Sequence, residues 1–336
     1  MKMGAKLHLI FNMKLKRLFP LLMVGALVSC NQNDFVKEDK VFCFDTVVDF
    51  KLYEGNDEDV SEIKTLLNYY DSISDNYKAR AGVNNVYTIN SSNEDVEVDA
   101  RLYNLLKTSF DASTNYGANY FNPLCGSLAK KWKEALANKQ ILDEETIASE
   151  LNKINTSSLT FKDNNVVQRT GEAEIDLGGI VKGYVLDEIG AYLSFRGISK
   201  YLINAGSSSI LLGEKNEGDG YFKVGIDSKI LANSYLKLKN CVVSTSSIAE
   251  QGVKITEEGP TYSHIINPII GSAINTQDAV IVISSNASKG DALSTSLMMN
   301  TVEEIKAIEA SQEIKCIVIK NKEVIYCNSS LEVLHR

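Results

Sequence analysis

The chain has no excess of positive charge. Its 35 lysines and arginines are outnumbered by 43 aspartates and glutamates, which gives a net charge of −8 at pH 7. Proteins that bind nucleic acid use lysine and arginine to neutralise phosphates, so this balance argues against a nucleic-acid partner. It does not exclude an anionic small molecule, because a lysine and a metal ion in one pocket outweigh the net charge.

Proline is scarce, and internal repeats and low-complexity linkers are absent. Only 4 prolines occur in 336 residues, while 44% of the residues are hydrophobic. This composition supplies enough apolar material for a packed core, and nothing in it divides the chain. We therefore predict one α+β domain with mixed or antiparallel sheets flanked by helices.

No N-terminal apolar run is long enough to cross a bilayer, which takes ~20 residues as a helix. The run 18–28 follows a basic stretch, Lys14–Arg17, and leads into Leu-Val-Ser-Cys at Cys30, a lipobox. We interpret residues 1–29 as a lipoprotein signal that is cleaved before Cys30, whose sulfur then carries lipid. A complete signal begins at Met13, so the first twelve residues are interpreted as an over-extended start. A buried N-terminal helix is the alternative.

The rest of the chain is predicted to be a tether and a domain. Residues 30–40 are polar and charged and are expected to link the lipid to a domain that spans 41–336. The predicted anchor places this domain outside the cytoplasm, attached to a bacterial membrane.

The cysteines beyond Cys30 have no metal-like or redox-motif spacing. They stand at positions 43, 125, 241, 316 and 327. An odd number is unusual in an exported protein. Buried free thiols are the default interpretation, and a single disulfide is left open.

The periodicity of apolar residues predicts the secondary structure of the domain. Helices are expected at 60–70, 98–114, 128–137, 144–153, 180–195 and 291–299. Strands are expected at 41–53, 159–161, 166–168, 173–177, 201–204, 209–212, 221–226, 235–238, 241–244 and 280–284. A terminal hairpin is expected from strands at 314–319 and 323–327.

One stretch, Glu174–Asp187, reads Glu-Ile-Asp-Leu-Gly-Gly-Ile-Val-Lys-Gly-Tyr-Val-Leu-Asp. The double glycine Gly178-Gly179 lets the backbone turn sharply between a strand and a helix and come close to a ligand. The start of that helix offers free N–H groups and a positive dipole end, where Lys182 adds a full charge. This pattern predicts a site for an anionic, phosphorylated molecule. A glycine turn at such a junction is also ordinary architecture.

Three later stretches follow this one in a fixed order. They are Val-Ser-Thr-Ser at 243–246, Tyr-Ser-His-Ile-Ile-Asn-Pro at 262–268 and Gly-Asp-Ala-Leu-Ser-Thr at 290–295. Together the four stretches resemble the ApbE family of bacterial flavin transferases, the FAD:protein FMN transferases. The resemblance extends from about Phe42 to the end of the chain.

Asp291 and Thr295 lie four residues apart on a predicted helix, so their oxygens share one face at its first turn. Hard oxygen ligands suit Mg²⁺, which takes one or two carboxylates with phosphate oxygens and water. The resemblance implies that both residues bind this metal and that the carbonyl of Gly179 completes the protein ligands. In the alternative interpretation, Ser288 and Asp291 form a capping box, and Asp291 only satisfies a helix start.

Outside the predicted signal the chain has two histidines, His264 and His335. His335 stands one residue from the C-terminus and is expected to be disordered. The resemblance places His264 at the active site, where it orients or deprotonates an attacking hydroxyl. It also gives Asp291 a catalytic role. A lone histidine is otherwise more often structural.

The resemblance also implies which residues contact FAD. The segment around Tyr120 resembles the family's Gly-x-Phe-Asp-Pro segment, which lines the flavin, and the double-glycine stretch lies near the phosphates. The expected contacts are Phe44, Tyr77, Tyr120, Phe121, Asn122, Asp176, Lys182 and Thr245.

Three places depart from the family pattern. Asp45 and Ser207 stand where the family has glycine, and Ile269-Ile270-Gly271 replaces Arg-Thr-Gly, which removes a charge near the active site. None of these changes touches the predicted metal ligands or His264. They therefore affect substrate detail more than reaction type.

The function that the resemblance implies is Mg²⁺-dependent transfer of FMN from FAD to a protein. The acceptor is a threonine or serine hydroxyl of an extracytoplasmic flavoprotein, such as a redox-pump subunit, and AMP is released. Two alternatives are left open. The same pocket can hydrolyse FAD to FMN and AMP, or the chain can be a lipid-anchored protein that binds FAD without chemistry.

Overall fold

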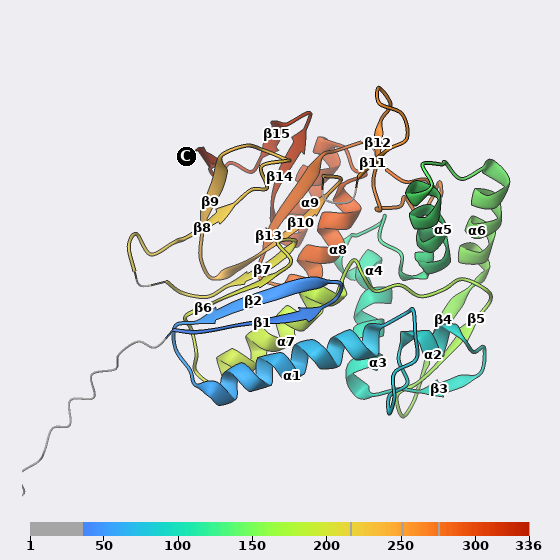
Figure 1. The fold of residues 1–336 in the computed structure, drawn as a ribbon, viewed down its shortest axis with the longest axis horizontal. Helices are drawn as coiled ribbons and strands as arrows, with labels where there is room; N and C mark the ends of the chain where they lie inside the picture. The colour runs from blue at the N-terminus through green and yellow to red at the C-terminus, as the bar shows by residue number, and fades with distance from the viewer. Residues whose placement is uncertain (1–35, 216, 250–251, 275, 336) are drawn as a thin grey trace, which may run out of the picture. The chain divides into compact units, whose positions relative to one another are not determined.

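Figure 1 shows the fold in a computed structural model of the chain. The structure describes residues 36–335 except 216, 250–251 and 275. The predicted signal, Cys30 and the first half of the predicted tether lie outside these residues. In the described part, no helix is both long enough and apolar enough to cross a membrane.

An eight-stranded antiparallel sheet lies at the centre of the domain (Figure 1). Each strand pairs antiparallel with its neighbours. Between its second and third strands the chain leaves the sheet to form seven of the described α-helices and a 3₁₀ turn. In spatial order the strands are β1 (Lys37–Cys43), β2 (Thr46–Leu52), β6 (Tyr201–Ala205), β7 (Ser209–Leu212), β10 (Cys241–Ser247), β13 (Ala279–Ser284), β14 (Lys315–Lys320) and β15 (Glu323–Cys327).

Three smaller sheets and ten helical segments complete the described fold. The small sheets are β3 (Asp95–Glu97), β5 (Val166–Thr170) and β4 (Ser158–Lys162); β16 (Leu334–His335), β9 (Ser234–Leu238) and β8 (Phe222–Gly225); and β11 (Val253–Lys254) with β12 (Thr261–Tyr262). The helices are α1 (Asp57–Ser74), α2 (Val86–Asn90), α3 (Ala100–Phe110), α4 (Ala112–Tyr116), the 3₁₀ turn η1 (Pro123–Cys125), α5 (Gly126–Ala137), α6 (Glu144–Thr156), α7 (Val181–Phe195), α8 (Ala287–Leu297) and α9 (Val302–Gln312).

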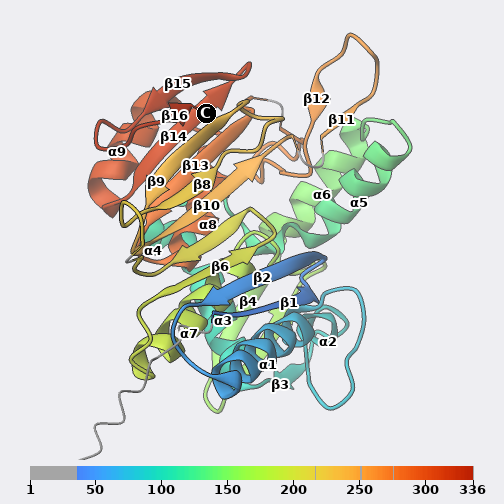
Figure 2. The ribbon, with the colours of Figure 1, turned by 60° about the vertical axis from the view of Figure 1, so that its left-hand side comes forward.

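The central strands are buried on both faces. Successive side chains point to opposite sides of the sheet, and each side packs against its own apolar cluster. On β13, Val280 and Val282 join a large apolar cluster shared with the helices, whereas Ala279, Ile281 and Ile283 join a smaller one shared with β8 and β9. Helix α8 packs against β10 and β13 on the helical side. Figure 2 shows the small sheet of β8 and β9 in front of these strands. The predicted α+β fold is therefore confirmed.

Helices α7 and α8 lie side by side, and each supplies a carboxylate to the first turn of the other. Asp187 on α7 accepts hydrogen bonds from the N–H groups of Ala287 and Ser288, at 2.7 and 2.8 Å. Asp291 on α8 accepts one from the N–H of Gly183, at 2.6 Å. The first N–H groups of a helix have no partner within it, so this exchange satisfies both starts.

The predicted strand 173–177 is wrong. This segment is extended but belongs to none of the described sheets. The side-chain amide of Asn90 pairs with both the N–H and the carbonyl of Ile175, at 2.7 and 2.9 Å. On its other side the segment bonds to the backbone of residues 123–126. An amide and a loop thus take the place of neighbouring strands, which no pattern of apolar residues reveals.

The capping-box interpretation of Asp291 is also wrong. Helix α8 begins four residues earlier than expected, and its N-cap is Asn286, whose side chain accepts from the N–H of Lys289. Ser288 is therefore inside the helix, and Asp291 lies in the second turn. A carboxylate in that position is not needed to cap its own helix, which leaves it available to α7.

Other expectations differ in detail. The expected strand 41–53 is a hairpin, because Phe44 and Asp45 both adopt left-handed backbone conformations, with φ of 53° and 56°. His335 is part of β16, and its Nδ1 lies 3.1 Å from the hydroxyl of Ser234, so the expectation of disorder is wrong. Helix α9 was not expected. The described cysteines are free thiols as expected, but only Cys43 and Cys316 are buried, and the other three are partly exposed.

Two glycines of α7 provide a test of the helix contact. A Cβ on Gly183 would lie 2.2 Å from the carbonyl oxygen of Ala287, whereas one on Gly190 meets only a methyl of Leu211, at 3.5 Å. Gly183→Ala should lower the free energy of unfolding in urea by about 2 kcal/mol or more. Gly190→Ala should leave it unchanged or raise it by up to about 1 kcal/mol, since alanine favours helix. Equal effects of the two substitutions would contradict the close packing.

Candidate functional site

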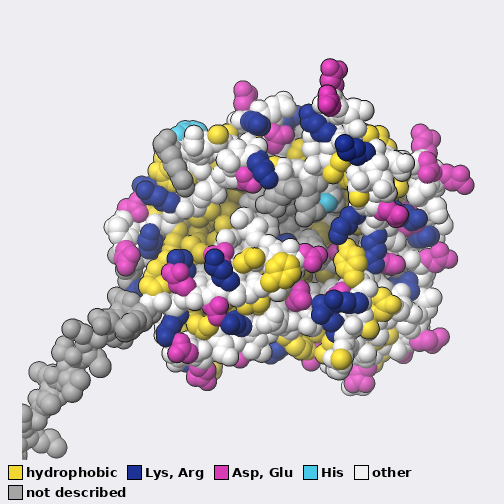
Figure 3. All heavy atoms as spheres, viewed as in Figure 1, with side chains coloured by type: hydrophobic (Ala, Val, Ile, Leu, Met, Phe, Trp, Pro, Cys, Tyr) yellow, Lys and Arg dark blue, Asp and Glu magenta, His cyan; other side chains and the backbone are white. Residues whose placement is uncertain are grey.

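A cavity of about 650 Å³ collects every described residue that the sequence assigned to ligand, metal or catalysis. Figure 3 shows a hollow on this face of the molecule, with lysine and arginine side chains along its rim. Because these residues line one cavity, their predicted roles are compatible in space. The roles themselves remain predictions. The residues are Phe44, Tyr77, Tyr120, Phe121, Asn122, Asp176, Gly179, Lys182, Thr245, His264, Asp291 and Thr295.

The start of α7 faces α8 across the floor of this cavity. A Cβ on Gly179 would lie 3.5 Å from the hydroxyl of Thr295 and 2.9 Å from the ring of Phe121. One turn further along, a Cβ on Gly183 would lie 2.9 Å from the carboxyl carbon of Asp291. Glycine is therefore required here by close approach, not by a left-handed backbone. Gly179 and Gly183, four residues apart, thus contact Thr295 and Asp291, which are four residues apart on α8.

Asp291 is buried and surrounded by hydrogen-bond donors. Besides the N–H of Gly183, the hydroxyls of Ser209 and Ser244 donate to it at 2.8 and 2.7 Å. Burial raises the pKa of Asp291 to about 6, although Lys182 and these hydrogen bonds act in the opposite direction. The carboxylate is thus costly to ionise in the protein alone.

The oxygen atoms that could act as metal ligands near Asp291 fit a magnesium ion. A carboxylate has about four lone-pair sites, and three are occupied here. The hydroxyl of Thr295, one helical turn further along α8, is a second hard oxygen, and it lies close to the backbone of Gly179. In the described part of the chain, no group of three or more His, Cys, Asp or Glu side chains is placed to hold a metal. A cation at this site therefore needs further oxygens from substrate or water.

A chain of hydroxyls extends from this floor along β10. The Ser246 hydroxyl lies 2.9 Å from that of Ser294 and 3.3 Å from that of Thr295. Sequence reasoning assigned no role to these serines or to Ser209 and Ser244. The sequence did contain a signal for them, because Ser244, Ser246 and Ser294 belong to the motifs that carry the family resemblance.

Lys182 and His264 line the same cavity as Asp291. No hydrogen bond or ion pair among the described residues engages the Lys182 ammonium. His264 is exposed and lines the cavity, yet desolvation by the surrounding protein and the charge of Lys182 both lower the pKa of His264. The imidazole is therefore neutral at pH 7 and able to accept a proton.

Asp176 is held in a local turn beside these groups. Its carboxylate accepts from the N–H of Gly178 at 2.7 Å, which fixes the chain just before α7. The Asn90 amide holds the preceding residue, as described above. The predicted placement of Asp176 at a strand end is wrong, but its predicted place in the cavity is correct.

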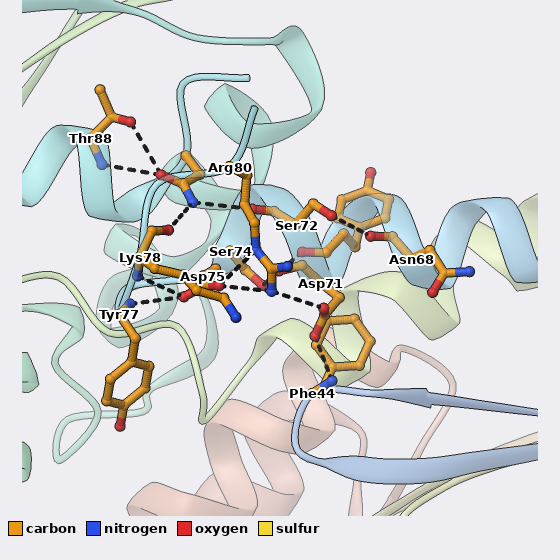
Figure 4. A network of polar contacts seen from close by, with 12 residues as sticks. Phe44, Asn68, Asp71, Ser72, Ser74, Asp75, Tyr77, Lys78, Arg80 and Thr88 are labelled. Atoms are coloured by element: carbon orange, nitrogen blue, oxygen red, sulfur yellow. Dashed lines mark hydrogen bonds and ion pairs between the residues drawn. The ribbon is translucent and has the colours of Figure 1, made fainter. Parts of the chain in front are cut away.

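An arginine network holds the aromatic side of the cavity (Figure 4). Arg80 bonds to the carboxylate of Asp75 at 2.8 Å and lies 3.6 Å from that of Asp71. Asp71 accepts from the N–H of Phe44 at the strained hairpin tip, at 2.6 Å. Asp75 accepts from the N–H of Tyr77, at 2.8 Å. One side chain thus positions two predicted ligand contacts, and sequence reasoning missed it.

Two of the three departures from the family pattern, Asp45 and Ser207, lie at turns with an unusual backbone conformation. Ser207 has a left-handed backbone, with φ of 63°, and Asp45 has the same conformation at the neighbouring hairpin tip. Both line the cavity. Glycine would adopt this conformation without strain, which fits the glycines of the family pattern at these two turns.

The cavity holds a lysine that no described carboxylate pairs with, a buried carboxylate and a neutral histidine, a combination typical of an enzyme that acts on an anionic ligand. The model of the ApbE family matches residues 44–318. The chain belongs to this family, and the predicted class of enzyme, a flavin transferase, is confirmed.

Relatives and solved structures resemble the chain over most of its length. A curated relative from Klebsiella pneumoniae (strain 342), named FAD:protein FMN transferase, is 27% identical over 281 residues, which cover 82% of this chain and 86% of the relative. The ApbE protein of Thermotoga maritima superimposes with a TM-score of 0.74 at 22% identity, covering 88% of this chain and 97% of its own. A histidine-to-glycine variant of the flavin transferase ApbE from Vibrio cholerae gives 0.71 at 19%, covering 88% and 98%. At these identities the solved structures show the fold alone.

The Arg80 network has a matched control at the opposite end of α1. Arg196 there lies 3.1 Å from Asp59 and 3.7 Å from Glu58, and the two arginine side chains are similarly exposed, at 34% for Arg80 and 32% for Arg196. Replacing either with methionine should lower the free energy of unfolding by about 1 kcal/mol. Only Arg80→Met should also weaken binding of the predicted ligand FAD, by about tenfold, because it frees Phe44 and Tyr77. Flavin-fluorescence titration measures this, and equal FAD affinities in the two variants would exclude a positioning role.

Proposed function

We propose that the chain transfers FMN from FAD to a threonine or serine hydroxyl of an extracytoplasmic flavoprotein, with Mg²⁺ bound, and releases AMP. The names of its relatives support flavin transfer to a protein. The observation that carries the proposal is the convergence of Lys182, the Asp291–Thr295 pair and His264 in one cavity. These groups come from distant parts of the chain and supply the three requirements of phosphoryl transfer: charge neutralisation, ligand positioning and proton removal.

In the proposed reaction the acceptor oxygen bonds to the phosphorus next to riboflavin. The bond from that phosphorus to the oxygen bridging to AMP breaks, and AMP leaves with the electron pair. The proton of the hydroxyl passes to the neutral imidazole of His264, whose lowered pKa keeps it unprotonated at neutral pH. FMN remains attached through a phosphoester.

The charge of the pyrophosphate is the main obstacle, and the floor of the cavity addresses it. Lys182 places an ammonium on the first turn of α7, and no carboxylate of the described residues pairs with it. Asp291, Thr295 and the carbonyl of Gly179 would hold Mg²⁺, which when bound neutralises charge developing on the phosphate oxygens. The Gly183 N–H is already taken by Asp291, so the anion site depends on Lys182 and the metal more than on the helix start alone.

The walls of the cavity suit a flat ring system. Phe44, Tyr77, Tyr120 and Phe121 line one side, and Phe121 is buried against Gly179. Asn122 accepts from the N–H of Leu124 and so fixes the turn that presents the last two of these rings. Aromatic side chains stack on such rings with little loss of conformational entropy.

The test is an assay with FAD, Mg²⁺ and candidate acceptor proteins. Transfer should give a flavin-fluorescent acceptor band that survives denaturation, together with AMP. Asp291→Ala and the milder Thr295→Val should each lower the rate, by about a hundredfold or more for Asp291→Ala. AMP release at a rate that added acceptor does not change would favour FAD hydrolysis, and FAD binding without AMP would favour a carrier. Full transfer by Asp291→Ala would contradict the proposed site.

We also propose that the domain is held outside the cytoplasm by lipid on Cys30. The lipobox and the basic and apolar segments before it support this. Covalent attachment of flavin would keep the cofactor on redox proteins that work outside the cell membrane. Cys30→Ser should release the chain from the membrane fraction, and unchanged membrane association would contradict a lipid anchor.

A further inference from the structure

The turn that follows His264 presents two isoleucines to solvent beside the cavity. Ile269 and Ile270 are 62% and 60% exposed. Single exposed apolar side chains are ordinary on a protein surface. Two in succession on a well-held turn next to a predicted active site indicate a contact surface.

Hydrogen bonds within the turn fix the backbone that carries the two isoleucines. The Asn267 side chain accepts from the N–H groups of Ile269 and Ile270, at 2.9 and 3.3 Å. Its backbone N–H donates to the Ser272 carbonyl and its carbonyl accepts from Gly271, at 2.9 and 2.8 Å. The tip is therefore fixed before any partner binds, which reduces the entropy lost on binding.

The base of the turn is fixed to α5, a helix whose residues Ala129, Lys130 and Lys133 line the cavity. The indole N–H of Trp132 on α5 donates to the carbonyl of Gly271 at 2.7 Å. A Cβ on Gly271 would lie 2.6 Å from a methyl of Ile147 on α6. Ile266, which lines the cavity, precedes the first exposed isoleucine by three residues, or about 10 Å of extended chain.

The same rim continues along α5. Lys133, the neighbour of Trp132, lines the cavity and lies over the exposed ring of Tyr77, 5.4 Å from its centroid. No carboxylate among the described residues forms an ion pair with Lys133. Helix α5 thus carries Lys133 at the cavity and also holds the base of the isoleucine turn through Trp132.

We propose that Ile269 and Ile270 form the docking element for the acceptor protein, an inference that rests on the proposed function. Transfer requires a hydroxyl of a macromolecule to reach phosphorus inside the cavity, so the acceptor chain must cross the rim. The isoleucine tip takes an apolar side chain of the acceptor near its target hydroxyl. The family pattern has Arg-Thr at these positions, so this chain offers an apolar contact where that pattern offers a polar one.

The experiment compares two reactions of the same full chain. The probe is the acceptor protein that the unaltered chain flavinylates, and water is the second acceptor, measured as AMP release from FAD alone. Ile269→Asp with Ile270→Asp should raise the KM for the acceptor protein by about tenfold or more, since buried apolar anchors dominate interfaces. AMP release to water should stay within about twofold of the unaltered rate, because the turn contacts no reacting atom.

Two further variants sharpen the result. Phe195→Asp removes an apolar side chain that is 89% exposed at the far end of α7, about 20 Å along the helix from Lys182, and should change neither reaction. Ile269→Arg with Ile270→Thr restores the family residues, keeps the turn chemistry and should lose the acceptor as the aspartates do.

Each outcome decides between the claims. Unchanged KM in both double variants would overturn the docking role while leaving the transfer intact. Loss of AMP release together with transfer would show that the turn supports the cavity, and this too would overturn docking. Absence of transfer by the unaltered chain with every acceptor would overturn the proposed function, and the docking role with it.

Discussion

The structure depends on the exchange of carboxylates between α7 and α8. Asp187 caps the start of α8, and Asp291 reaches back to the start of α7. The two helices approach closely only because glycine stands at 183, and the same contact brings Gly179 beside Thr295. The same contact between α7 and α8 therefore serves both the fold and the site. It satisfies the starts of the two helices and also brings together the residues of the predicted metal site.

This arrangement has an energetic cost that function offsets. Burial raises the pKa of Asp291 from 3.8 to about 6. A carboxyl whose pKa is raised on folding stabilises the fold fully below its unfolded pKa, and that contribution is lost as the pH rises through about 6. The loss is roughly 3 kcal/mol at neutral pH. Positive charge from Lys182, and from a bound cation, compensates the ionised group. A site poised to take up a cation is consequently less stable without one.

The predicted site residues were found from the sequence because they stand in motifs with a fixed order. Gly179, Lys182, His264 and the Asp291–Thr295 pair were expected together and line one cavity. Their supports were not. Arg80 acts through Asp71 and Asp75, and Asn90 replaces a neighbouring strand for Ile175, and both depend on contacts between distant segments. Local apolar patterns contain no information on such contacts, so the segment 173–177 was read as a strand.

The most direct test of the account is the pH dependence of Mg²⁺ affinity, measured from thermal stabilisation of the FAD-bound chain. A metal that binds through Asp291 competes with a proton, so the affinity should fall about tenfold for each pH unit below 6 and level off above it. Asp291→Ala should abolish the stabilisation by Mg²⁺ at every pH. An affinity that does not change between pH 5 and pH 8, or stabilisation that survives in Asp291→Ala, would contradict the central role of this carboxylate.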